Sequence, residues 1–138
     1  MKRIEITRML SASPEDVFAA WTDPALMAQW FYAHPTWTVD VDADVRVGGS
    51  YSLTMKSPDG EEFETHGEYR EIEAPVRLVF TWSSYIVDNT VVTIELRPDR
   101  GGTELRLVHE LFDSDEIRER HNQGWVGCLD SLDRFAAR

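Results

Sequence analysis

The sequence lacks the features that would place the protein in an oxidising compartment or in a membrane. It has a single cysteine, Cys128, in 138 residues, which excludes an intramolecular disulfide and any metal site built from several cysteines. No apolar run approaches the roughly 18 residues that a membrane-spanning helix needs, and residues 1–10 lack the continuous apolar segment of a signal peptide. We therefore expect a cytoplasmic protein without membrane insertion.

Positive charge is also scarce. Lys and Arg together number 14 against 25 Asp and Glu, so the net charge is -11. Most of such a surface repels nucleic-acid phosphate, and we expect no nucleic-acid partner. The sequence contains no nucleophile elbow, zinc-ligand spacing, Rossmann fingerprint or Walker motif, and its VGG and RGG segments are too short for a phosphate loop. These absences predict no metal and no cofactor.

What the sequence does contain is enough apolar material for one core. Hydrophobic residues make up 42% and charged residues 28% of the chain, with no repeat or long linker, which predicts a single domain over residues 1–138. Residues 3–11 alternate as a strand. Ser13 and the following Pro begin a helix over 14–21, and a second Asp-Pro start predicts a helix over 24–31. From residue 37 to 110 the hydrophobic period is two, and turn residues divide the stretch into six strands.

The last helix has an unusual composition because it contains two glycines. We expect it to begin at Asp113 as N-cap, with Glu116 completing a capping box. At helical spacing, one bulky stripe comprises His121, Trp125, Leu129, Leu132 and Ala136, and a neighbouring stripe of mostly small residues comprises Gly124, Cys128, Ser131 and Phe135. Each glycine costs a helix about 1 kcal/mol relative to alanine. The glycines therefore predict either a close approach of the helix backbone to the sheet or space for a ligand beside Trp125.

The order of these elements predicts an α+β helix-grip fold. In this fold a curved antiparallel sheet wraps around a long C-terminal helix, and two short helices follow the first strand. One helix does not completely fill a strongly bent sheet, so a cavity commonly remains between them.

Five segments of the chain resemble the SRPBCC (START-like, major birch-pollen-allergen-like) superfamily. Within it, they are similar to the family related to the C-terminal domain of the activator of the 90-kDa heat-shock protein ATPase. The segments are SPEDVFAAWTDPALMAQWF (13–31), VRVGGSYSLTMKSPDG (45–60), GEYREIEAPVRLVFTW (67–82), VTIELRPDRGGTELRLVHELF (92–112) and HNQGWVGCLDSLDRF (121–135). The resemblance implies a helix-grip fold with an internal pocket for lipophilic or aromatic ligands. It does not imply one activity, because members include binders, transfer proteins, cyclases and cochaperone domains.

The candidate ligand-binding residues are those whose strand or helix position turns an aromatic, soft or polar side chain inward. They are Trp30, Phe31, Tyr51, Met55, Tyr69, Phe80, Trp82, His109, His121, Trp125 and Leu129. His109 is the sharpest candidate, since its strand parity predicts an inward imidazole that could act as acid or base together with Tyr69. The alternative is a structural histidine bonded to backbone. His109 and His121 lack a clear third ligand for a metal.

Three functions follow from these residues and from the resemblance. The first is non-catalytic binding of a small hydrophobic or aromatic molecule between sheet and helix, which the missing catalytic motifs favour. The second is an enzyme of the polyketide cyclase or hydratase type that uses His109. The third is a cochaperone-like protein with a chaperone as its partner. Exposed strand edges would also allow a homodimer, although no specific interface is evident in the sequence.

Overall fold

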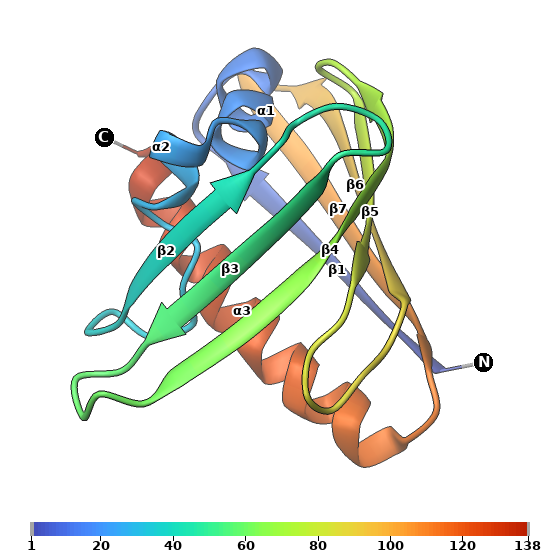
Figure 1. Cartoon of the computed structure of the whole chain (residues 1–138). Helices are drawn as coiled ribbons and strands as arrows, with labels where there is room; N and C mark the ends of the chain where they lie inside the picture. The colour runs from blue at the N-terminus through green and yellow to red at the C-terminus, as the bar shows by residue number, and fades with distance from the viewer. Residues whose placement is uncertain (1, 138) are drawn as a thin grey trace.

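A seven-stranded antiparallel sheet curls around the C-terminal helix in the computed structural model, which describes residues 2–137 (Figure 1). The sheet order is β1-β7-β6-β5-β4-β3-β2, so β1 and β2 are its edges. The strands are β1 (Lys2–Leu10), β2 (Thr38–Ala43), β3 (Ser50–Lys56), β4 (Glu62–Glu73), β5 (Arg77–Trp82), β6 (Thr90–Asp99) and β7 (Gly102–Phe112), and the helices are α1 (Pro14–Thr22), α2 (Pro24–Met27) and α3 (Asp115–Ala136). This arrangement confirms the α+β helix-grip fold.

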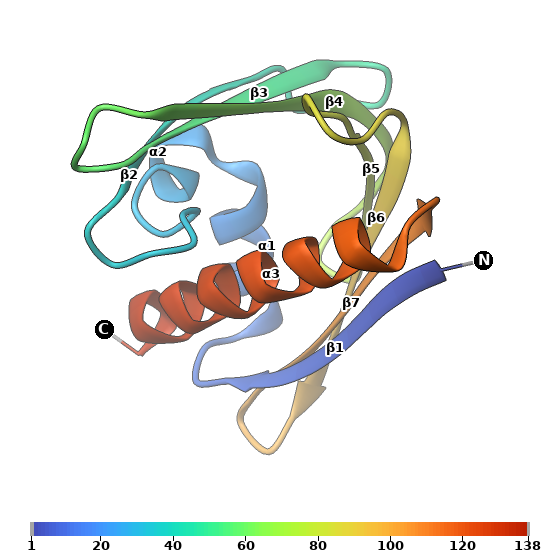
Figure 2. The same ribbon diagram turned by 90° about the horizontal axis from the view of Figure 1, so that it is seen from below.

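The sheet bends most visibly along β4, which changes partner along its length. Its first half pairs with β3, its second half pairs with β5, and the register with β5 shifts between Tyr69 and Glu71. At Gly67 a Cβ atom would lie 2.0 Å from the backbone oxygen of Thr81, so only glycine permits this approach. The curled sheet leaves a concave face, and α3 runs across it (Figure 2).

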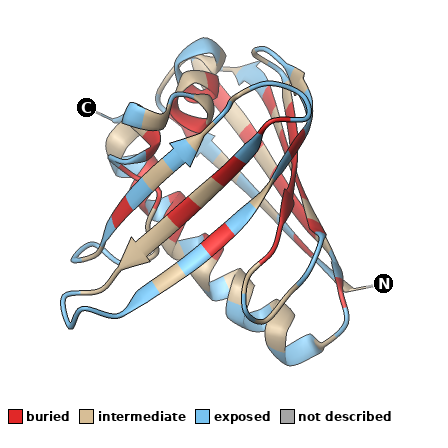
Figure 3. Cartoon of the chain, in the orientation of Figure 1, coloured by how far each residue is buried: buried red, intermediate tan, exposed pale blue. Residues whose placement is uncertain are grey.

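The two faces of the sheet differ as the period-two pattern predicts. Inward residues of the central strands are buried, whereas most outward residues remain intermediate or exposed (Figure 3). The exceptions are Val79, Thr81 and Val108, which face outward and are buried. On the outer face, Arg106 of β7 pairs with Glu5 of β1 and, at 3.0 Å, with Glu95 of β6. Arg77 of β5 reaches the same Glu95 at 2.7 Å. A row of ion pairs thus crosses four strands on the solvent-exposed face of the sheet.

Helix α3 presents both expected stripes to the sheet. Trp125, Leu129 and Leu132 of the bulky stripe are buried, as are Cys128 and Ser131 of the small stripe. Asp130, Asp133 and Arg134 of the same helix are exposed. Burial of this apolar face, rather than helix propensity, holds α3 in place.

The second short helix is shorter than predicted. We expected it over 24–31, but α2 ends at Met27, and a tight turn carries the chain through Trp30 to Phe31. Trp30 and Phe31 are both buried, and their rings stack with centroids 4.6 Å apart. The Trp30 and Phe31 amides both donate to the Met27 carbonyl, at 3.2 and 2.9 Å, and this turn carries the two rings into the core.

The start of α3 is one residue later than predicted. Ser114, not Asp113, is the N-cap, and its hydroxyl accepts a hydrogen bond from the Ile117 amide at 3.3 Å. Serine and aspartate cap helices about equally well, so local preference does not choose between them. Strand β7 continues to Phe112, which is buried, and this extension moves the helix start forward.

Candidate functional site

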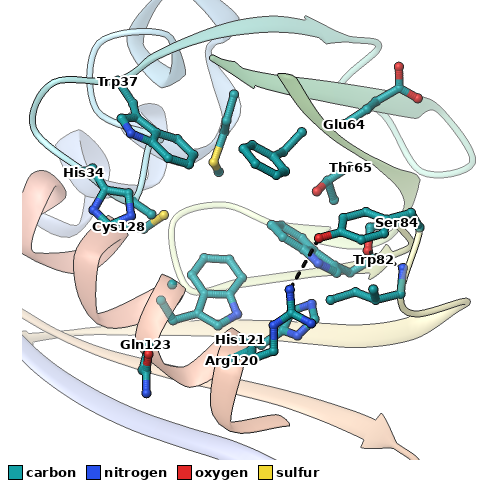
Figure 4. Close-up of a pocket in the computed structure, with 17 residues that line it drawn as sticks. His34, Trp37, Glu64, Thr65, Trp82, Ser84, Arg120, His121, Gln123 and Cys128 are labelled. Atoms are coloured by element: carbon teal, nitrogen blue, oxygen red, sulfur yellow. Dashed lines mark hydrogen bonds between the residues drawn. The ribbon is translucent and has the colours of Figure 1, made fainter. Parts of the chain in front are cut away.

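A pocket of about 400 Å³ opens between the first half of α3 and the sheet (Figure 4). Its other sides are the segment between α2 and β2, the β3–β4 hairpin and the loop between β5 and β6. Five aromatic residues line it: Trp37, Phe63, Trp82, Tyr85 and Trp125. Trp37 and Phe63 stack with centroids 5.4 Å apart and planes only 6° apart, and Trp82 lies 5.0 Å from Trp125. These rings present flat apolar surfaces to the cavity.

The structure divides the eleven candidate residues between this pocket and a filled core. Those that line the pocket are Met55, Trp82, His121 and Trp125. Those that pack in the core outside it are Trp30, Phe31, Tyr51, Tyr69, Phe80, His109 and Leu129. A second void, bounded in part by Tyr51, Tyr69 and Phe80, measures only about 10 Å³, room for a single water molecule at most. The space between the sheet and α3 is therefore filled with side chains at one end, the solid end, and contains the pocket at the other, the hollow end.

The two glycines of α3 have different surroundings. A Cβ atom on Gly127 would lie 2.1 Å from the backbone oxygen of Ala33, so this glycine lets the helix approach the segment between α2 and β2. A Cβ atom on Gly124 would meet nothing within 4 Å, and Gly124 lines the pocket. Gly127 thus permits a close approach, but to the segment between α2 and β2 and not to the sheet, and Gly124 leaves open space.

His109 is fully buried and belongs to a chain of hydrogen bonds. The indole N–H of Trp125 donates to its Nδ1 at 3.0 Å, so Nδ1 carries no proton and Nε2 carries one. Nε2 then donates to the Thr90 hydroxyl at 2.8 Å, and this hydroxyl donates to the Trp82 carbonyl at 2.6 Å. Burial, reinforced by His121, holds the pKa of His109 well below its usual 6.5. The imidazole is neutral, and both of its nitrogens are engaged.

His121 has a different environment at the edge of the pocket. Its Nδ1 lies 2.9 Å from the Ile117 carbonyl, which can only accept, so Nδ1 is the protonated nitrogen. Burial lowers the pKa of His121, and the charge of Arg120 lowers it further, against the effect of the backbone hydrogen bond. The neutral ring leaves Nε2 as an acceptor, and no residue among 2–137 donates to it. A hydroxyl or amide of a ligand could occupy this position.

Two other groups offer little reactivity. Cys128 lines the pocket, but burial raises its pKa to about 12, so it remains a thiol and is a poor nucleophile. Burial likewise raises the pKa of Tyr69 to about 12. Within the described part of the chain, no three His, Cys, Asp or Glu side chains are grouped to hold a metal ion.

Sequence reasoning missed several residues that line the pocket. Tyr85 lies in the loop between β5 and β6, where no periodicity marks it. Arg120 donates to the Tyr85 hydroxyl at 3.4 Å across the opening (Figure 4). A signal for Arg120 did exist, because it lies one turn before Gly124 and extends the stripe of Gly124 and Cys128. His34 is exposed, and its ring centroid lies 4.7 Å from that of Trp37 at the edge of the pocket.

The sequence matches a known family over residues 11–137, and the family is described as activator of Hsp90 ATPase homolog 1-like protein. This chain belongs to that family. The match identifies an activator of Hsp90 ATPase homolog 1-like domain of the SRPBCC superfamily, in agreement with the resemblance of the five segments. No functionally curated protein sequence matches the chain significantly.

Solved structures of other members share the fold of this activator of Hsp90 ATPase homolog 1-like domain. A protein from Chromobacterium violaceum is 29% identical, with a TM-score of 0.89 over 99% of this chain and 97% of that one. An AHSA1-like protein from Aeromonas hydrophila is 28% identical, with a TM-score of 0.85 over 97% and 91%. The AHSA1 protein from Silicibacter pomeroyi is 25% identical, with a TM-score of 0.86 over 99% and 98%. Within residues 2–137, no helix has the length and apolar character to cross a membrane.

Proposed function

We propose that the protein binds a small hydrophobic or aromatic molecule, without transforming it, in the pocket between the sheet and α3. The observation that carries the proposal is the open space at Gly124, beside Trp82 and Trp125, in a cavity of about 400 Å³. Small-molecule sites usually occupy about 300–1,000 Å³ and combine apolar walls with a few polar groups. The stacked Trp37 and Phe63 rings suit a planar ligand.

Titration with fatty acyl, polyketide-like and aromatic compounds tests the proposal. Trp37, Trp82 and Trp125 line the cavity, so an occupant should change the tryptophan fluorescence. A ligand at about 100 times its Kd should also stabilise the fold by about 2.7 kcal/mol. No response in either measurement across the three compound classes would contradict the proposal.

A pair of substitutions on α3 locates the binding site. Gly124→Leu places an isobutyl group in the cavity and should abolish binding while the melting temperature is retained. Val126→Leu is the matched control, because Val126 is an exposed residue of the same helix outside the pocket. Equal affinities in the two variants would place the ligand elsewhere.

The geometry favours binding over the cyclase-like alternative. His109 lies outside the pocket lining, and both of its ring nitrogens are hydrogen-bonded, so acid or base chemistry would require it to release Trp125 or Thr90. Tyr69 lies in the solid end of the core. The cochaperone alternative rests on the family description; a pull-down with the chaperone ATPase as bait tests it directly.

A further inference from the structure

The opening of the pocket holds a cation without an anionic partner. Arg120 lines the pocket, and among residues 2–137 its guanidinium forms no ion pair with a carboxylate. Its described partner is the Tyr85 hydroxyl, at the long distance of 3.4 Å. A guanidinium has five N–H donors, so most of them remain available. Arg70 and Arg134 also form no ion pair within residues 2–137, but Arg120 differs from them because it lines the pocket.

Two polar groups in the pocket wall also have no hydrogen-bond partner among residues 2–137. Trp82 is 7% exposed, and its indole N–H has no acceptor in the described chain. Thr65 is 9% exposed, and its hydroxyl is likewise unpaired. Among residues 2–137, the fully buried side-chain polar atom without a partner is Trp21 Nε1, in the core. The Trp82 N–H and the Thr65 hydroxyl therefore keep access to the pocket, where a ligand can form hydrogen bonds with them. Figure 4 shows Arg120 reaching from α3 toward the Trp82 side of the pocket.

These groups have the same polarity. Arg120 and Trp82 can only donate, and the Thr65 hydroxyl can donate as well. The donors of Arg120 and Trp82 favour an acceptor on the ligand, and a guanidinium fits a planar carboxylate best. We propose that the ligand is an amphipathic acid, with its carboxylate held by Arg120 and Trp82 and its apolar body against Trp37, Phe63 and Trp125. This assignment rests on the proposed function above, because it names the chemical class of the same ligand.

The charges around the pocket permit this assignment. Glu64 is the carboxylate in the lining, and Figure 4 shows its side chain directed away from the cavity. Glu64 also lies 4.0 Å from His66 on the outer face. The acceptor nitrogen of His121 is left for a hydroxyl or amide elsewhere on the ligand. The anionic group of the ligand is therefore assigned to the donors at and near Arg120.

A matched acid and amide test the class of ligand. Naphthalene-2-acetate and naphthalene-2-acetamide have nearly the same shape, but only the first is charged at pH 7.5. By isothermal titration calorimetry, the acid should bind the natural protein about tenfold more tightly, since hydrogen bonds between charged groups are the stronger ones. Arg120→Met should reduce the affinity for the acid to that for the amide and leave the amide unchanged. Trp82→Phe should also reduce the ratio of the affinity for the acid to the affinity for the amide.

The control is Arg118→Met, which removes the same charge two residues away. Arg118 lies outside the pocket and pairs with Asp115 at 3.9 Å on the surface, so its loss should change neither affinity. Thermal melts of each variant establish that the fold is retained. The assignment is overturned if the natural protein binds acid and amide equally, or if Arg120→Met leaves the acid-to-amide affinity ratio unchanged. Either result still leaves the pocket as a binding site. If neither compound binds, the proposed function fails, and the assignment fails with it.

Discussion

Replacing each glycine of α3 by alanine should change stability in opposite directions. Both substitutions gain about 1 kcal/mol of helix propensity. At Gly124 nothing opposes this gain, because a Cβ atom there meets no atom within 4 Å. At Gly127 the new Cβ would lie 2.1 Å from the Ala33 oxygen, whereas carbon and oxygen approach only to about 3.3 Å even in close contacts. The backbone must therefore separate by about 1.2 Å.

The size of the difference follows from these contacts. Overpacking of a core costs about 1–3 kcal/mol, and the upper value applies at Gly127 because the obstacle is backbone that cannot rotate away. Gly127→Ala should thus lose about 2 kcal/mol net, and Gly124→Ala should gain about 1 kcal/mol. For a chain of this length, a difference of about 3 kcal/mol separates the two melting temperatures by about 12 °C.

Chemical denaturation in urea measures both free energies of unfolding, and thermal melts provide an independent value. Because the two substitutions are identical in chemistry and lie on the same helix, helix propensity cancels between them. Stabilisation by both, or destabilisation by both to a similar extent, would refute the assignment of close approach to one glycine and open space to the other.

Two further predictions concern the buried histidines and the helix cap. Burial lowers the pKa of His109 and of His121 below 6.5, so below that pH the unfolded chain binds more protons than the folded one. The free energy of unfolding should therefore fall as the pH drops from about 6.5 to 5, by up to about 1.4 kcal/mol per pH unit for His109. Urea titrations at several pH values measure this dependence, and a flat profile contradicts it. Ser114→Ala should cost about 1 kcal/mol, whereas Asp113→Ala should stay within about 0.5 kcal/mol; the reverse order would restore Asp113 as the cap.

The sequence was sufficient for most of the fold because the fold depends on local periodicity. The alternation from residue 37 to 110 predicts the six strands that the structure contains, and the parity of His109 predicts its inward direction correctly. The helix boundaries near residues 28 and 113 were wrong because tertiary burial decided them. A turn after Met27 carries Trp30 into the core, and β7 continues to the buried Phe112.

The candidate site was less predictable, because strand parity distinguishes inside from outside but not one end of the interior from the other. Tyr51 and Met55 share a face of β3, yet Tyr51 packs in the solid core and Met55 lines the pocket. Their difference depends on how the loops between elements close over the concave face. Tyr85 lies in such a loop and carries no sequence signal, whereas Arg120 could have been found by extending the stripe of small residues one turn toward the helix start.

The boundary between the solid and the hollow end falls at the two glycines. Gly127 lets α3 contact Ala33, and this contact holds the segment that carries Trp37, which forms one side of the pocket. Trp37 in turn stacks on Phe63 of β4 and so connects helix, segment and sheet. The pocket is therefore not a packing defect at the end of the core. Gly127 allows the aromatic side of the cavity to be held in place, and Gly124 leaves the cavity open. Together the two glycines cost the helix about 2 kcal/mol of helix propensity.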